Sequence, residues 1–129
     1  MKDSCVYGTI WAGRAQEALC VLSDRPTLRE CQAFHRWLDK EKGFSQDLPV
    51  NVMLLVEEVG EVAKEVRRLQ KAQADPQLAA QESEALLHLR EELADCLAFI
   101  VKLSNYAGVD LEAAYVEKMR YNTGREWRE

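Results

Sequence analysis

Hydrophobic and polar residues alternate with a helical period along two long stretches of the chain. In residues 53–69 and 86–103, large apolar residues recur every three or four positions, the spacing of one helix face. The two stripes consist of Leu55, Val59, Val62, Val66 and Leu69, and of Leu89, Leu93, Cys96, Ile100 and Leu103. We expect both stripes to face inward. No stretch alternates with period two over several residues, so the sequence predicts an all-α fold.

The first well-marked helix has clear signals at both ends. Thr27 and Glu30 match a capping box, and Gly43 follows the last residue of the periodic pattern, so we expect a helix over about 28–42. The next helix should run from about Pro49 to residue 74. Its cap is either Ser45 or Asp47, and the sequence leaves that choice open.

The second half of the chain carries similar stop and start signals. The Asp-Pro pair at 75–76 reads as a cap followed by a first-turn proline, and a firm helix should cover about 84–107. Gly108 should end that helix in the left-handed conformation, and Asp110 should cap a last helix over 111–122. We therefore expect a bundle of about four main helices, with the acidic motifs on its long pair.

The length of 129 residues suits one compact domain, which we place at 27–129. Residues 1–26 are then an N-terminal extension. Within it, residues 9–22 have a rough helical period that Gly13 weakens, so a short helix is the hypothesis there.

Charge and hydropathy exclude several classes of protein. Charged residues make up 30% of the chain and the net charge is −5, which gives no general attraction to nucleic acid or to an anionic membrane. No apolar run has the roughly 18 to 20 residues of a membrane span, and the N-terminus lacks a signal-peptide core. We expect a cytoplasmic protein that binds neither nucleic acid nor membrane.

Cysteine and histidine provide no obvious site. The four cysteines are scattered and form no metal-ligand cluster, so we interpret them as reduced and structural: Cys5, Cys20, Cys31 and Cys96. His35 and His88 also lack a partner at metal-ligand spacing, which favours surface or packing roles.

Two acidic pairs interrupt the apolar helices. Glu58/Glu61 and Glu92/Asp95 each have i,i+3 spacing, and in each helix the pair lies next to the apolar stripe. With 22 acidic residues in 129, about three to four such pairs arise by chance, so the spacing alone proves nothing. A solvated acidic face and a site for a hard divalent cation are both compatible with the pattern.

The order of several motifs resembles one family. The sequence has ExxE at 58–61, ExxD at 92–95, Gly-Val-Asp-Leu-Glu-Ala-Ala at 108–114 and Lys-Met-Arg-Tyr-Asn at 118–122. In this combination it resembles the MazG-like all-α nucleotide pyrophosphohydrolases, over about residues 28–125. One departure is a longer spacer between the two acidic motifs than is usual in the family.

The resemblance implies a reaction and a metal site. Family members hydrolyse a nucleoside triphosphate between the α and β phosphorus atoms, which yields a monophosphate and pyrophosphate, with Mg²⁺ as cofactor and Mn²⁺ as a substitute. By carry-over, Glu58, Glu61, Glu92 and Asp95 are the metal ligands. Either Glu57 or Glu61 would accept the proton of the attacking water.

The resemblance also assigns substrate-binding residues. Lys118, Asn122 and Arg125 match residues near the phosphates. An ordinary surface charge is the alternative for Lys118 and Arg125, and a helix C-cap explains Asn122 equally well from sequence. The assignment for the base consists of Phe34, His35, Trp37 and Asn51. Core packing is at least as good an explanation for Phe34, and also for Phe99, one turn after Asp95.

Family members are dimers, or tetramers built from dimers, so the resemblance implies self-association. The expected substrate is a deoxynucleoside triphosphate, with a housekeeping role in the nucleotide pool; the preferred base is left open. The alternative is a non-catalytic helical regulatory or interaction module. A phosphoribosyl-ATP pyrophosphatase would share the architecture, but the Lys-Met-x-x-Asn end and Gly60 favour the MazG-like branch. A di-iron protein would need Glu-x-x-His pairs, which are absent from the sequence.

Overall fold

The computed structural model describes residues 22–126, which are helical throughout apart from their connections. The helices are α2 (Leu28–Lys42), α3 (Leu48–Ala74), the short 3₁₀ helix η1 (Pro76–Gln81), α4 (Glu82–Tyr106) and α5 (Leu111–Thr123). No strand occurs in this range, so the predicted all-α class is confirmed. The hypothesised helix at 9–22 and the roles of Cys5 and Cys20 fall outside the described residues. None of the helices in 22–126 has both the length and the hydropathy to cross a membrane.

Local sequence determines where the helices begin and end. The Thr27 hydroxyl accepts a hydrogen bond from the Glu30 amide at 3.1 Å, and the Glu30 carboxylate accepts one from the Thr27 amide at 2.7 Å, which is the predicted capping box. Gly43 ends α2 in the left-handed conformation, with φ of 64°. Asp47 caps α3 by accepting from the Val50 amide at 2.9 Å, which decides between the two caps left open.

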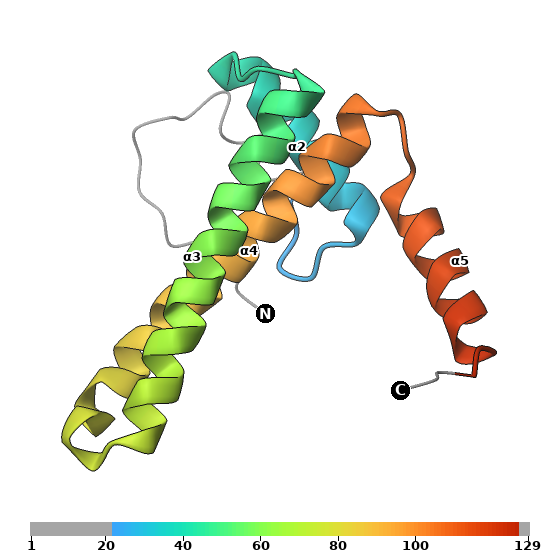
Figure 1. Cartoon of the computed structure of the whole chain (residues 1–129). Coiled ribbons are helices and arrows are strands. Elements are labelled where there is room, and N and C mark those ends of the chain that lie inside the picture. Colours follow the sequence, from blue (N-terminus) through green and yellow to red (C-terminus); the bar gives the residue numbers. More distant parts are fainter. Residues whose placement is uncertain (1–21, 127–129) are drawn as a thin grey trace, which may run out of the picture.

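The long helices α3 and α4 form an antiparallel pair joined by η1, and α2 packs across α4 (Figure 1). Figure 1 also shows that α5 turns away from the pair, and its main packing partner is α2. The four main helices are those predicted. However, α5 does not lie along the long pair as the fourth helix of a compact bundle would.

The inward orientation expected for both apolar stripes is only partly correct. Val59 and Val66 on α3 are 52% and 44% exposed, and Leu93 and Ile100 on α4 are 53% and 43% exposed. The seam between the helices instead follows Leu55, Glu58, Val62, Glu65, Leu69 and Ala72 on α3, which are buried or half-buried. Among the elements of residues 22–126, the main neighbours of α3 are α4 and η1, which pack against one side of that helix.

The turn between α4 and α5 is fastened to α2 by one buried side chain. Gln32 is 4% exposed; its amide nitrogen donates to the Val109 carbonyl at 2.8 Å, and its amide oxygen accepts from the Leu111 amide at 3.1 Å. Gly108 has the predicted positive φ, 68°, which lets the chain reverse there. Outside the turn, Arg29 pairs with Asp110 at 3.2 Å.

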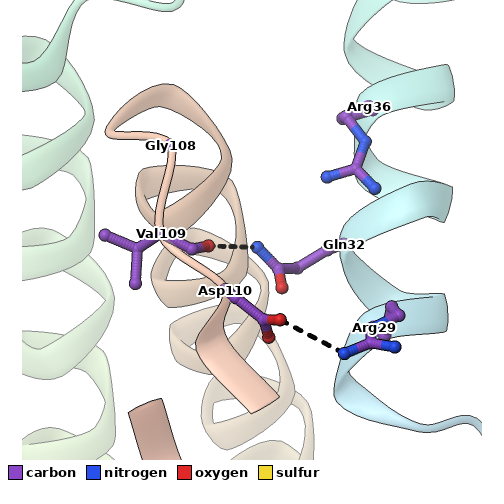
Figure 2. Close-up of a pocket in the computed structure, with 6 residues that line it drawn as sticks. All are labelled: Arg29, Gln32, Arg36, Gly108, Val109 and Asp110. Carbon is purple, nitrogen blue, oxygen red and sulfur yellow. Dashed lines mark hydrogen bonds and ion pairs between the residues drawn. The ribbon is translucent and has the colours of Figure 1, made fainter. Parts of the chain in front are cut away.

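Figure 2 shows the contacts of Gln32 with Val109 and of Arg29 with Asp110, beside a pocket of about 330 Å³ between α2 and the turn. It is lined by Arg29, Gln32, Arg36, Gly108, Val109 and Asp110. Gln32 and Arg29 on α2 hold both the turn and the first residues of α5. These contacts therefore set the direction in which α5 leaves the turn.

Candidate active site

Three of the four predicted metal ligands meet in the seam between α3 and α4. Glu58 comes from α3, whereas Glu92 and Asp95 come from adjacent turns of α4, and one carboxylate oxygen of each lies within 4.8 Å of the others. The i,i+3 spacing puts Glu92 and Asp95 on one face of α4, and the antiparallel pairing of the helices puts Glu58 opposite them. Oxygen atoms from three carboxylates at this spacing fit the coordination preference of Mg²⁺ or Mn²⁺.

The electrostatics of the cluster also favour a cation. Partial burial raises the pKa of Glu58, and the charge of Asp95 and the hydrogen bond and charge of Glu92 raise that pKa further. The neighbouring Cys96 thiol has a raised pKa too, first from burial and then from Glu58. Every contribution to Glu58 opposes its ionisation. A divalent ion among the three carboxylates would reverse this local balance.

The other two predicted acidic residues lie at the edge of the cluster. The carboxylate of Glu61 accepts a hydrogen bond from the Lys64 ammonium at 2.6 Å and is about half exposed, so it does not join the group of three. Glu57 is exposed. Their roles as fourth ligand and general base stay predictions.

The predicted phosphate-binding residues belong to α5 and the residues after it. Figure 1 shows α5 apart from α3 and α4, so a single chain does not bring Lys118, Asn122 and Arg125 to the acidic cluster. The Lys118 ammonium lies 5.2 Å from the Tyr121 ring centroid, and Asn122 has a buried side-chain oxygen that lacks a hydrogen bond among the described residues.

Of the residues predicted to bind the base, three cluster on α2. Phe34 and His35 have ring centroids 5.3 Å apart, and Phe34 and Trp37 have theirs 6.1 Å apart. Phe34 and His35 also line an apolar pocket of about 230 Å³ between α2 and α4. The pKa of His35 is lowered, first by burial and also by the charge of Lys102, although Asp39 opposes this shift.

Asn51, the fourth of these residues, has a clear structural role. It is 1% exposed, and its amide nitrogen donates to the carbonyls of Ser45 and Asp47 at 2.9 and 2.7 Å. It therefore holds the loop that precedes α3. Contact with a base stays a prediction.

Sequence reasoning missed a polar group one turn beyond Phe99. The Lys102 ammonium lies 3.4 Å from Asp39 Oδ1, and 4.7 and 5.1 Å from the ring centroids of Phe44 and Phe99. A signal was present, because Asp95, Phe99 and Lys102 are spaced i, i+4 and i+7 and so share one helix face.

The helical structure of residues 22–126, with a carboxylate cluster between two antiparallel helices, is what the resemblance to MazG-like proteins predicts. The protein-family model of the MazG nucleotide pyrophosphohydrolase domain matches residues 46–125 of the sequence. The chain belongs to this family.

Curated relatives give a finer comparison. Over 105 residues the chain is 35% identical to dCTP pyrophosphatase 1 of Rattus norvegicus, and 34% identical to the proteins of that name from Mus musculus and Homo sapiens. Each alignment covers 80% of this chain and 61% of the relative, so the chain spans about three fifths of the length of these relatives.

Proposed function

We propose that the protein is a Mg²⁺-dependent nucleoside triphosphate pyrophosphohydrolase, which cleaves between the α and β phosphorus atoms and releases a monophosphate and pyrophosphate. The observation that carries this proposal is the meeting of Glu58, Glu92 and Asp95 within 4.8 Å in a chain of the MazG family. A triphosphate has about four negative charges and would be repelled by these carboxylates unless a cation stood between them.

Each acidic residue has a separate task in this proposal. Glu58, Glu92 and Asp95 hold the cation, and Glu61 becomes a fourth ligand after its carboxylate leaves Lys64. A bound Mg²⁺ or Mn²⁺ supplies charge neutralisation and a lower pKa for the attacking water. Glu57 or Glu61 accepts the proton of that water.

The substrate proposal combines the relatives' name with the aromatic cluster on α2. The relatives are dCTP pyrophosphatases by name, so we propose a deoxynucleoside triphosphate as substrate and removal of surplus or unusual nucleotides as the role. Phe34, His35 and Trp37 would lie around the base, with Asn51 supporting the preceding loop. Lys118, Asn122 and Arg125 would stabilise the charge on the phosphates.

Self-association would complete the site. The outer faces of α3 and α4 expose many large apolar side chains, a feature of surfaces that become buried on association. The most exposed are Met53 (67%), Val56 (64%), Leu93 (53%), Val59 (52%) and Leu87 (52%). We propose that a second copy covers these faces in a dimer or a tetramer, and that α5 of one copy reaches the acidic cluster of another.

Release of pyrophosphate tests the reaction. The purified protein should convert a deoxynucleoside triphosphate to monophosphate and pyrophosphate with Mg²⁺ or Mn²⁺, and should stop when a chelator is added. Glu92→Gln should reduce kcat by at least about 100-fold, because a ligand is lost. Glu91→Gln is the matched control: it removes a neighbouring, exposed carboxylate and should retain activity.

Two results would oppose the proposal. An active Glu92→Gln protein would exclude the cluster as the site, and a wild type that cleaves no nucleotide would favour a non-catalytic helical module.

Mixing of subunits tests the assembly. Glu92→Gln and Lys118→Ala proteins, each inactive alone, should recover activity when unfolded and refolded together. One site of a mixed dimer would then combine the acidic cluster of the Lys118→Ala copy with α5 of the Glu92→Gln copy, and both of these are intact. Light scattering that shows only monomers, or mixtures that stay inactive, would contradict a shared site.

A further inference from the structure

Lys102 is a nearly buried cation in a setting that is unusual for lysine. Its side chain is 11% exposed and that of its counter-ion, Asp39, is 1% exposed. Lysine is seldom buried unless it is paired, and its ammonium group normally extends to water. Here the ammonium instead stays 3.4 Å from Asp39 Oδ1, and it lies 4.7 and 5.1 Å from the ring centroids of Phe44 and Phe99.

Local sequence builds this arrangement. Gly43 takes a positive φ of 64°, so the chain folds back and the Phe44 amide donates to the Asp39 carbonyl at 3.1 Å. The ring of Phe44 then lies near Lys102 while remaining 48% exposed. On the other side of Asp39, the Tyr106 hydroxyl donates to Oδ2 and fixes the carboxylate. Asp39 is thereby a rigid anchor for the ammonium.

The group has unused hydrogen-bonding capacity. Asp39 Oδ1 has its ion pair with Lys102 but no hydrogen bond, and His35 Nδ1 is buried with none among residues 22–126. An ammonium group has three protons, and the Phe44 and Phe99 rings that flank it are not conventional acceptors. Buried polar atoms without a hydrogen bond are uncommon in folded proteins, and a bound ligand, ion or water is one explanation for them.

The position along α4 connects this group to the acidic cluster. Asp95, Phe99 and Lys102 lie on one face of the helix, and the seven residues from Asp95 to Lys102 correspond to about 10 Å of helix. That is comparable to the reach of a nucleotide from its phosphates to the Watson–Crick edge of its base. A nucleotide held by its phosphates at the cluster can therefore extend its base along this face to Lys102.

We propose that Lys102 reads the edge of the nucleobase, donating a hydrogen bond to a keto oxygen while Phe44 or Phe99 contacts the ring face. Cytosine, thymine, uracil and guanine have such an oxygen, whereas adenine has none. The site therefore selects keto-bearing bases and discriminates against adenine. Asp39 acts as a positioning residue, because it holds the ammonium without contacting the base. This inference rests on the proposed function, since it assumes a nucleotide at the acidic cluster.

Binding of non-cleavable nucleotides tests the inference separately from catalysis. Calorimetry with the α,β-methylene analogues of dCTP, dTTP and dATP in Mg²⁺ gives Kd for each base. The wild type should bind the dCTP and dTTP analogues at least about tenfold more tightly than the dATP analogue. Asp39→Asn/Lys102→Met removes both charges and leaves no unpaired buried ion; its Kd values for the three analogues should become equal to within about twofold.

Two further variants separate base reading from folding. Lys102→Arg keeps a positive donor and should retain part of the selectivity. It provides the test if the double variant proves unstable. Lys71→Met, an exposed lysine near the far end of α3, should leave the ratio of Kd values unchanged.

The outcomes distinguish the two proposals. Equal binding of all three analogues by the wild type, or undiminished selectivity in a folded double variant, would overturn the role of Lys102. Selective binding without any pyrophosphate release from dCTP would leave that role intact and reject the proposed reaction. Absence of binding to every analogue would reject both.

Discussion

Two acidic regions lie along the same seam between α3 and α4, and they differ in the charges that surround them. Near one end of the α3–α4 pair, the buried carboxylate of Glu65 accepts two hydrogen bonds from Arg68, at 2.9 and 3.2 Å, and Arg68 also lies 3.7 Å from Glu84. Two helical turns along α3, Glu58 faces Glu92 and Asp95, and each neighbouring charge opposes its ionisation.

The difference identifies which region is structural. Glu65 is neutralised by a cation from its own helix, so the seam is complete there without a ligand. Among the described residues, the charges that shift the pKa of Glu58 are all carboxylates, and such an arrangement costs free energy until a cation arrives. The same residue type in the same seam is thus an internal ion pair in one place and a candidate ion-binding site in the other.

The largest expected effect is the loss of stability when the ion pair of Glu65 and Arg68 is broken. Arg68→Met leaves Glu65 buried without a partner and should lower the free energy of unfolding by about 3 kcal/mol, as measured by urea denaturation. Glu65→Leu/Arg68→Met removes both charges and should restore most of the loss. A single variant as stable as the wild type would contradict the contrast between the two regions.

Divalent ions should stabilise the protein through the cluster of Glu58, Glu92 and Asp95, and not through the Glu65 ion pair. At about 100 times Kd, Mg²⁺ or Mn²⁺ should add about 2.7 kcal/mol to the unfolding free energy of the wild type. Thermal melts should show this gain in Glu65→Leu/Arg68→Met and not in Glu92→Gln. An equal gain in all three proteins would place ion binding elsewhere.

A smaller effect should come from His35, which lies outside both acidic regions. Burial lowers its pKa in the folded chain below the ordinary 6.5, so between these two values the unfolded chain binds more protons. Stability is then fully present above pH 6.5 and falls as the pH decreases through 6.5 towards the folded-state pKa.

Melts from pH 7.5 to 5.5 should therefore show a shallower loss of stability for His35→Asn than for the wild type. His88→Gln, on the exposed side of α4 beside Glu84 and Glu91, is the control and should follow the wild type. Identical curves for all three proteins would assign the acid sensitivity to the carboxylates instead.

The smallest effect should be that of an exposed ion pair. Arg29 and Asp110 are 67% and 49% exposed at their side chains, so Arg29→Ala should cost at most about 0.5 kcal/mol. Gln32→Ala, at the buried contact to the same turn, should cost more, because it leaves the Leu111 amide without its partner. Chemical denaturation of the two variants measures this order, and the reverse order would contradict it.

Helix boundaries were predictable because their causes are local. The capping box at Thr27, the left-handed Gly43 and the Asp110 cap each depend on a few neighbouring residues, and all three form as expected. The orientation of the apolar stripes was less predictable. Val59 and Val66 follow the helical period correctly, but whether a periodic stripe is covered depends on which elements pack against it.

The candidate site divides in the same manner. Order and spacing of the motifs identified the family and pointed to Glu58, Glu92 and Asp95, which the fold brings together. The i,i+3 spacing permits an ion pair between Glu61 and Lys64. Periodicity could not show whether the Glu61 carboxylate would bind Lys64 or join the acidic cluster, because that choice depends on the side chains around it in the fold.

The sequence by itself determined the helical class, the ends of the helices and the acidic motifs, because these follow from backbone propensity, capping and residue order over short distances. Only the tertiary structure decided that three carboxylates from α3 and α4 face one another, that Arg68 on α3 also reaches Glu84 on α4, and that Asp39 from α2 holds Lys102 from α4. Charge pairing across helices depends on register and crossing, which arise only when the whole chain has folded.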